Sequence, residues 1–396
     1  MKIGIAGAGL SGRLLAWELA TRGHAVTVFD PAPGPGQPAA SYDGHPGRQP
    51  YAAGWTAAGM LSPVAELETG DEDIYALGER SLQRWPEIIG ALPQPVFHRQ
   101  QGSLMLAHRG DDGAARRMTE LLAHKLARLG RDAGEAARLI QRIDLAELRR
   151  LEPAIQGPTQ AWLLPGEGQL HTRQALEALA DAASRLGVQW RWGETVARLR
   201  PHALLAASGE HAFDWVFDAR GLGARPEQAL RGEDLSLTPQ LRGEDLSFTP
   251  QLRGVRGEVL WLHAPGVTLN RPLRLLHPRH RVYIVPRPGD IVFIGASEIE
   301  SEDRGPVSLR SAVELMAAAH SVIPELAEAR VVHLETNLRP ALPDNLPRIE
   351  TAPGLGRVNG LFRHGWLIAP ALVERAVQAF ERTAATPPAS ADNTAP

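Results

Sequence analysis

Near its start the chain reads Ile3-Gly-Ile-Ala-Gly-Ala-Gly-Leu-Ser-Gly12, and a second apolar run, Ala25-Val-Thr-Val-Phe-Asp30, follows. The first apolar residues predict a short buried strand, and residues 10–22 predict a helix that Gly23 ends. Residues 25–30 predict a second strand. This strand–helix–strand order, with three glycines at the first turn, predicts a Rossmann-type unit.

The three glycines and the acid that closes the second strand are typical of a dinucleotide site. The first glycine allows a tight turn, the second lets the backbone approach a pyrophosphate, and the third lets the helix pack on the sheet. The helix N-terminus would face the phosphates. The acid can accept hydrogen bonds from both ribose hydroxyls, and its charge would repel the 2′-phosphate of NADP. We therefore expect dinucleotide contacts from Gly7, Gly9, Leu10, Ser11, Gly12 and Asp30.

The composition excludes several kinds of chemistry. The chain has no cysteine, which excludes disulfides, thiolate catalysis, iron–sulfur clusters and a flavin attached through a cysteine. Lys2 and Lys125 are the only lysines, which argues against a lysine Schiff base or a P-loop. The histidines do not have the spacing of metal ligands, so we expect no metal site.

Length and charge suggest the general class of protein. A chain of 396 residues favours two domains, and the net charge of -3 gives no reason to expect nucleic acid as a partner. No apolar run approaches the roughly 20 residues that span a bilayer. The first residues do not read as a signal peptide. We therefore expect a cytoplasmic protein. The sequence leaves open whether it forms a homo-oligomer.

The remaining pattern distinguishes FAD from NAD. An NAD dehydrogenase continues with regular strand–helix units, whereas here a nucleotide domain is interrupted by strand-rich sequence, which suits a flavin oxidase. Predicted helices cover residues 72–90, 111–130, 172–186 (with Thr172 as N-cap) and 369–382. Predicted strands cover residues 102–107, 188–192, 216–219, 256–262, 282–286 and 291–296.

Three segments are expected to lie outside the packed domains. Residues 31–50 are rich in Pro, Gly and Ser and predict a long loop. Leu230–Gln240 recurs almost unchanged as Leu241–Gln251, which predicts a duplicated insert at 231–252 in a surface loop, with no assigned function. The tail at 386–396 is expected to be disordered.

From Ala57 onward the chain resembles the amino-acid oxidases of the D-amino-acid oxidase superfamily, and most closely the glycine oxidases of thiamine biosynthesis. The blocks that carry the resemblance are Ala57-Ala-Gly-Met-Leu-Ser-Pro63, Arg256-Gly-Glu-Val-Leu260, Val282-Tyr-Ile-Val-Pro-Arg287 with Ile294-Gly-Ala-Ser297, Asn337-Leu-Arg-Pro-Ala-Leu-Pro-Asp344 and Gly360-Leu-Phe-Arg-His-Gly-Trp-Leu-Ile-Ala-Pro370. The resemblance covers nearly the whole chain apart from the loop, the insert and the tail.

The resemblance implies a fold of the α/β class. It implies a Rossmann-like FAD-binding domain of the D-amino-acid oxidase type, with an inserted α+β substrate domain built on a mostly antiparallel sheet. The expected FAD-binding domain is discontinuous and comprises residues 1–90, 148–222 and 337–385. The expected substrate domain comprises residues 91–147 and 223–336.

The resemblance also assigns residues to the substrate. Oxidising an amino acid requires its carboxylate to be held so that Cα–H faces flavin N5, and an arginine fork is suited to this. Arg339 matches the family's carboxylate-binding arginine, and Tyr283 can reach the same carboxylate. Arg363 matches a second arginine near the flavin, and Met60 lines the pocket. Glu298 stands at a usually apolar position, where it could repel a carboxylate or recruit an amine.

Non-covalent FAD is the cofactor that the resemblance implies. Gly365 would open a helix whose N-terminal end stabilises negative charge at the N1–C2=O side of the reduced flavin. Thr56 could supply the hydroxyl that related oxidases provide with a serine. His364 is not expected to act as a base, because the family needs no protein acid or base. The residues expected at FAD besides the first turn are Thr56, Ala57, Ala58, Gly59, Met60, Val196, Gly221, Arg339, Arg363, His364, Gly365, Leu367 and Ile368.

The implied reaction is oxidative deamination of a small amino acid. Glycine is the first substrate to expect, and sarcosine and small D-amino acids are the alternatives. Hydride transfer from Cα would give an imine, then glyoxylate and ammonia, with O2 as acceptor and H2O2 as product, and the imine could serve thiamine thiazole synthesis. Departures such as Leu361, His364 and Asn345 leave other functions open. These are another FAD amine oxidase or dehydrogenase, including a tRNA-modifying type, and a flavin-binding protein without turnover.

Overall fold

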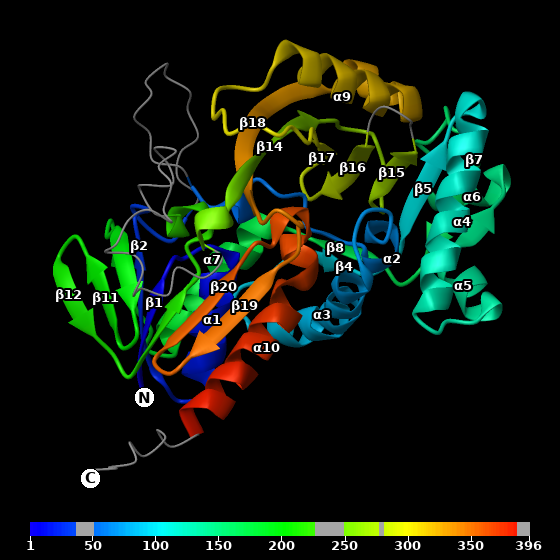
Figure 1. The fold of residues 1–396 in the computed structure, drawn as a ribbon. Helices are drawn as coiled ribbons and strands as arrows, with labels where there is room; N and C mark the ends of the chain where they lie inside the picture. The colour runs from blue at the N-terminus through cyan, green and yellow to red at the C-terminus, as the bar shows by residue number, and fades with distance from the viewer. Residues whose placement is uncertain (37–50, 226–248, 277–280, 386–396) are drawn as a thin grey trace, which may run out of the picture.

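The computed structural model describes residues 1–36, 51–225, 249–276 and 281–385. Within these residues two large sheets form the body of the molecule (Figure 1). The first sheet contains, in spatial order, β19 (Arg348–Ala352), β20 (Leu355–Asn359), β13 (Trp215–Asp218), β1 (Lys2–Ala6), β2 (Ala25–Asp30) and β9 (Gln189–Trp192). Its neighbours pair in parallel except for β19, which runs antiparallel to β20.

The predicted Rossmann-type unit is confirmed. Strand β1 pairs in parallel with β2, and α1 (Leu10–Thr21) connects them. Gly7 has φ +99°, a conformation that a side chain would strain. A Cβ at Gly12 would lie only 1.8 Å from the carbonyl oxygen of Gly7. The third glycine therefore allows α1 to start directly against the turn.

Helices cover one face of this sheet. Helices α1, α3 (Glu72–Ala91), α7 (Thr172–Arg185) and α10 (Gly365–Ala385) share one hydrophobic core with β1, β2 and β13. The opposite face is covered by a small antiparallel sheet of β10 (Val196–Arg200), β11 (Ala203–Ala206) and β12 (Gly209–Ala212), which packs through residues such as Leu204 against Phe29. The layers agree with an α/β domain.

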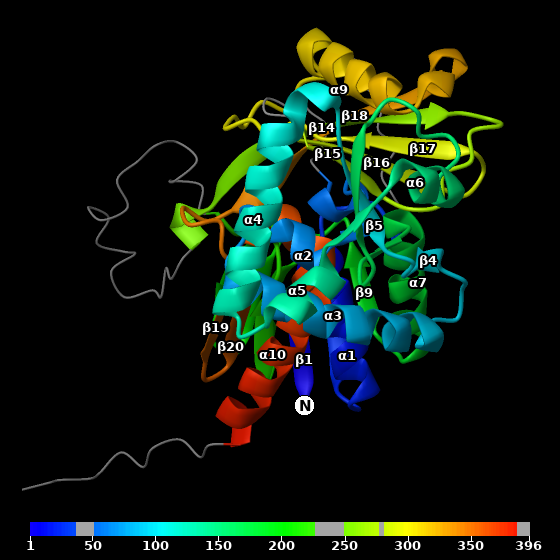
Figure 2. The ribbon, with the colours of Figure 1, turned by 90° about the vertical axis from the view of Figure 1, so that its right-hand side faces the viewer.

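The second large sheet is mostly antiparallel, as predicted. It contains, in spatial order, β18 (Arg330–Ala341), β14 (Arg253–His263), β17 (Ile291–Gly295), β16 (Arg281–Arg287), β15 (Leu273–Leu276), β5 (Ser103–Ala107), β7 (Gln160–Leu164) and β6 (Gln141–Ile143). Only the β15–β5 pairing is parallel among these described strands. Helix α9 (Leu309–Val322) packs on the face turned away from the first sheet (Figures 1 and 2).

Smaller elements complete the body. Helices α4 (Asp112–Arg128) and α5 (Ala133–Leu139) pack in a core with β5 and β7, and α6 (Leu145–Leu151) lies between β6 and β7 in the chain. A three-stranded sheet of β3 (Met60–Leu61), β8 (Gly168–Leu170) and β4 (His98–Arg99) lies between the large sheets. No helix in the described part of the chain is long and apolar enough to cross a membrane.

The structure corrects several predicted boundaries. Strand β7 belongs to the second sheet, although residues 148–222 were assigned to the FAD-binding domain, because its apolar residues pair with β5. His171, rather than Thr172, is the N-cap of α7. Helix α10 begins at Gly365, as the resemblance implied, and not near residue 369, where the apolar periodicity placed its start. Residues 337–341, which were also assigned to the FAD-binding domain, end β18 of the second sheet. The division into domains otherwise stays a proposal. Most of the predicted loop, the first part of the insert and the tail lie outside the described residues.

The early start of α10 has a local explanation. Pro370 lies inside the helix and has no N–H to donate to the carbonyl of Trp366, four residues earlier. The indole Nε1 of Trp85 donates to that carbonyl at 2.9 Å. A side chain from α3 therefore replaces the missing helical hydrogen bond.

Gly12→Ala should destabilise the protein by about 1–3 kcal/mol or more, because the added Cβ must displace the backbone of the first turn. Thermal and chemical denaturation would measure the loss. Gly90→Ala in α3 is the matched control, since its Cβ would meet no atom within 4 Å. The control should be neutral or stabilising by up to about 1 kcal/mol. Equal stability of Gly12→Ala and the wild type would contradict the close packing of α1.

Candidate functional site

One continuous cavity of about 2070 Å³ connects the first turn of the chain with β14, β16, β18 and the start of α10. The predicted site residues that line it are Gly7, Gly9, Leu10, Ser11, Asp30, Thr56, Ala57, Ala58, Gly59, Met60, Val196, Gly221, Tyr283, Glu298, Arg339, Arg363, His364, Gly365 and Leu367. Gly12 does not line it, in agreement with its packing role. Ile368 does not line it either, because its side chain is fully buried in the core of the first sheet.

The nucleotide end of the cavity is built by the parallel pairing of β1 and β2. This pairing places the glycine turn and Asp30 at the same edge of the sheet. Asp30 accepts hydrogen bonds from the amide nitrogens of Ala8 at 2.6 Å and Ala32 at 2.8 Å. No side chain caps the N-terminus of α1 at Gly9. Its free amides can therefore bind a phosphate, and the cradle fits a dinucleotide.

Arg13 supports the same turn, and the sequence analysis did not identify it. Its side chain is buried, with Nε donating to the carbonyl of Ala8 and Nη1 to that of Leu176, both at 2.7 Å. The guanidinium lies over the rings of Trp55 and Trp192. Burial lowers the pKa of Arg13 to about 10. The sequence signal for Arg13 was a charged residue directly after the glycine motif, in the first half of a mostly apolar helix.

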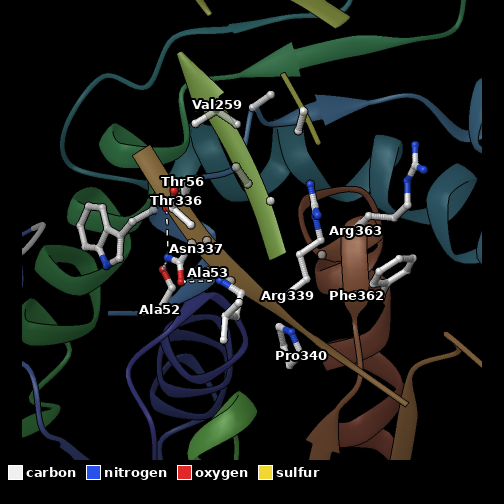
Figure 3. Close-up of a pocket in the computed structure, with 18 of the residues that line it drawn as sticks. Ala52, Ala53, Thr56, Val259, Thr336, Asn337, Arg339, Pro340, Phe362 and Arg363 are labelled. Carbon is white, nitrogen blue, oxygen red and sulfur yellow. Dashed lines mark hydrogen bonds between the residues drawn. The ribbon is translucent and has the colours of Figure 1, made fainter. Parts of the chain in front are cut away.

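A buried carboxylate holds the segment after residue 50. Glu335 on β18 accepts hydrogen bonds from the hydroxyls of Thr56 at 2.6 Å and Tyr51 at 2.7 Å, and from Arg173 at 2.9 Å. Asn337 donates to the oxygen of Thr56 at 3.0 Å (Figure 3). Thr56 therefore lines the cavity as predicted, but its hydroxyl serves the protein's own network.

The network also keeps Glu335 ionised. Burial raises the pKa of Glu335, but hydrogen bonds from His333, Thr56 and Tyr51 outweigh this effect, so that the pKa lies below its ordinary value. A buried carboxylate with several donors is costly to remove, because its partners would lose their acceptor. Sequence reasoning missed Glu335, since Tyr51, Thr56 and Arg173, which donate hydrogen bonds to it, are far away in the chain.

Arg339 lies at the other end of the cavity. Its Nη1 donates to the carbonyl of Arg256 at 3.3 Å, and its Nη2 donates to that of Ser297 at 3.2 Å. No carboxylate within the described ranges forms an ion pair with it. Burial lowers the pKa of Arg339, although a guanidinium stays protonated in proteins. The site thus contains a cation that can receive a carboxylate from outside.

Tyr283 and Met60 line the same region. The ring of Tyr283 stacks on Phe293, and burial raises the pKa of its hydroxyl, which therefore stays protonated. Tyr283 faces Gly295 across the β16–β17 pair, where a Cβ would lie 2.6 Å from the tyrosine hydroxyl. Met60 packs against the apolar cluster that contains Val259 and Phe293.

A cluster of paired charges lies beside Arg339. Arg363 Nη1 is 3.1 Å from Glu298 Oε2, and Arg363 Nε is 3.2 Å from Glu66 Oε2. Arg274 also pairs with Glu66, and Nδ1 of His364 lies 3.0 Å from that carboxylate. Glu66 ends α2 (Pro63–Glu66), directly after the Met60 block, and was not predicted as a site residue.

The pairing sets the charge states of this cluster. Burial raises the pKa of Glu66, but Arg363 and Arg274 lower it well below its ordinary value. Burial lowers the pKa of Arg363, but Glu66 and Glu298 raise it above its ordinary value. Both partners therefore stay charged. The N-terminal end of α10 opens on the cavity next to them at Gly365, where its amides can stabilise negative charge.

Comparison with known proteins finds relatives among flavin-dependent oxidoreductases. The family model described as FAD dependent oxidoreductase matches residues 2–378. A Rhizobium etli protein named as a thiamine biosynthesis oxidoreductase, ThiO, is 34% identical and covers 94% of each chain. A glycine oxidase of Geobacillus kaustophilus is 27% identical over 96% of this chain and 94% of its own. The crystal structure of glycine oxidase from the same organism superposes with a TM-score of 0.75 at 23% identity, covering 96% and 94% of the two chains.

Replacing the buried acid of β18 tests its structural role. Glu335→Gln should cost about 1.5–3 kcal/mol of stability at neutral pH, because Arg173 loses its charged acceptor. The loss would be measured by chemical denaturation. Since the pKa of Glu335 is lowered by folding, its contribution is present above the ordinary glutamate pKa of about 4.3 and is lost as the pH falls through the folded value. The gap between variant and wild type should therefore shrink below that pH.

Glu328→Gln is the control for this experiment, because Glu328 is exposed. Its stability should match that of the wild type both at neutral pH and below the ordinary glutamate pKa. A Glu335→Gln protein as stable as this control would show that the network contributes little.

Proposed function

The chain belongs to the FAD dependent oxidoreductase family, and on that premise we propose that it oxidises a small amino acid, glycine first, by transferring the Cα hydride to FAD. The observation that carries this proposal is Arg339. It is a partly buried cation without a carboxylate partner in the described part of the chain, and it lines the cavity that begins at the dinucleotide turn.

The nucleotide end would hold the adenosine and pyrophosphate of FAD. The amides at the start of α1 would bind the phosphates, and Asp30 would accept hydrogen bonds from the ribose. When bound, FAD supplies the redox chemistry, since it is the acceptor of the hydride. The first turn of α10, beginning at Gly365, would bind near the flavin ring and offer its amides to negative charge.

The substrate would be bound by its carboxylate. Arg339 presents a planar fork that pairs with a carboxylate in bidentate fashion, and the two backbone carbonyls that bind this fork restrict its orientation. Tyr283 lines the same part of the cavity and keeps its proton, so that it can donate a second hydrogen bond. A carboxylate held at two points limits how Cα can be presented to the cofactor.

The proposal assigns no side chain as a general base. His364 lies against the Glu66 carboxylate, and the amino acid would react as the neutral amine. The product would be an imine, which water converts to glyoxylate and ammonia when glycine is the substrate. The name of the Rhizobium etli relative supports the further proposal that this imine serves thiamine thiazole synthesis.

The substrate is tested on the purified flavoprotein under nitrogen. Glycine should reduce the bound flavin, seen as loss of its visible absorbance, and the aerobic reaction should release H2O2. Sarcosine and small D-amino acids complete the panel. A yellow protein that none of these compounds reduces would contradict the proposed function and favour a flavin-binding protein without turnover.

Arg339→Ala should raise the KM for glycine by about a hundredfold, equal to roughly 3 kcal/mol, while FAD stays bound. Steady-state kinetics and the flavin content of the purified variant would check both parts. Arg330→Ala is the control, because Arg330 lies on the same strand but is exposed and does not line the cavity. Similar KM values for the two variants would remove Arg339 from its proposed role.

A further inference from the structure

Glu298 follows β17 and extends to the charged cluster beside the proposed carboxylate site. Its Oε2 is 3.1 Å from Nη1 of Arg363, and its side chain is 38% exposed. The other nitrogens of Arg363 bind Glu66, with Nε at 3.2 Å and Nη2 at 3.5 Å. Each of the three guanidinium nitrogens therefore contacts a carboxylate. Arg339 and Arg363 project in the same direction from neighbouring elements (Figure 3).

The charges in this region are unequally matched. Arg274 and Arg363 carry two positive charges, and Glu66 and Glu298, with which they pair, carry two negative charges. These four charges cancel. Arg339 is left as the cation that no carboxylate of the described residues pairs with. One unmatched positive charge corresponds to one substrate carboxylate.

Glu66 alone could not neutralise this cluster. It is shared between Arg363 and Arg274, so without Glu298 these two guanidinium groups would form ion pairs with a single carboxylate, and Glu68 would be the one further acid of the described residues whose charge acts on Arg363. Nη1 of Arg363 would then lack its acceptor. Because the side chains of Arg363 and Arg274 are only 15% and 12% exposed, water screens the excess charge weakly. A second carboxylate on a ligand would match both the free donor and the excess charge.

We propose that Glu298 is a specificity-determining residue that restricts the site to ligands with a single carboxylate. It does so by occupying the Arg363 donor that a second carboxylate would need and by placing a negative charge beside it. This inference rests on the proposed function, because it takes the Arg339 region as the substrate site. It assigns the acid at position 298 to the rejection of dicarboxylates, rather than to the recruitment of an amine.

Acetate and malonate are a matched pair of probes, since they differ in the second carboxylate. Each would be titrated into the FAD-loaded full-length protein at a pH where both acids are ionised, and binding would be followed by the change in the flavin spectrum. In Glu298→Gln the affinity for malonate relative to acetate should rise by at least about tenfold over the wild type. Glu298→Met also removes the charge and should shift the ratio in the same direction.

Glu300→Gln is the matched control. It removes the same charge two residues further along, from an exposed glutamate that pairs with Arg253 and does not line the cavity. Its malonate-to-acetate ratio should equal that of the wild type. Flavin content and melting temperature would be measured for each variant, and Glu298→Met provides the ratio if Glu298→Gln does not fold.

The outcomes distinguish a failure of the role proposed for Glu298 from a failure of the proposed function. If acetate binds but neither Glu298 variant changes the ratio, or if Glu300→Gln changes it equally, the role of Glu298 is overturned while the proposed function stands. If acetate does not bind the wild-type holoprotein and glycine does not reduce its flavin, the carboxylate site itself fails, and this inference fails with it.

Discussion

The close contact between the third glycine of the first motif and the turn before it is the constraint on which the rest of the structure depends. A Cβ at residue 12 would lie 1.8 Å from the carbonyl oxygen of Gly7, so that α1 can start against the turn only without a side chain there. This start directs the first amides of the helix toward the cavity. The position of α1 in turn fixes where α7 and α10 pack against it in the shared core.

Buried and partly buried arginines connect this framework with the cavity in two ways. Arg13 and Arg287 donate to backbone carbonyls, those of Ala8 and Ala58, in the two segments that line the cofactor end. Burial lowers the pKa of Arg287 to about 9. These arginines fix the backbone, whereas Arg363 is held by acids. Arg339 donates to two carbonyls but also lines the cavity, which makes it the cation available to an incoming carboxylate.

The sequence was most informative where local rules apply. The glycine spacing and the apolar periods of residues 3–30 predicted the first unit, because backbone sterics and side-chain alternation act over a few residues. The family resemblance located Arg339 and Tyr283, and the cavity brings both together. The start of α10 at Gly365 followed from the family resemblance but not from the apolar periodicity, because the donor that replaces the Pro370 amide is Trp85, which lies 281 residues from the carbonyl it binds.

By itself the sequence determined the dinucleotide turn, which follows from local geometry and a short motif. Its resemblance to a known family implied the second, mostly antiparallel sheet and the residue types that face the cavity. Only the tertiary structure decided how the charges are paired. Glu66 meets Arg274 across 208 positions and Arg363 across 297, and Glu335 meets Thr56 across 279. The energy of such pairs depends on distance, burial and the number of partners, and these quantities exist only once the chain has folded.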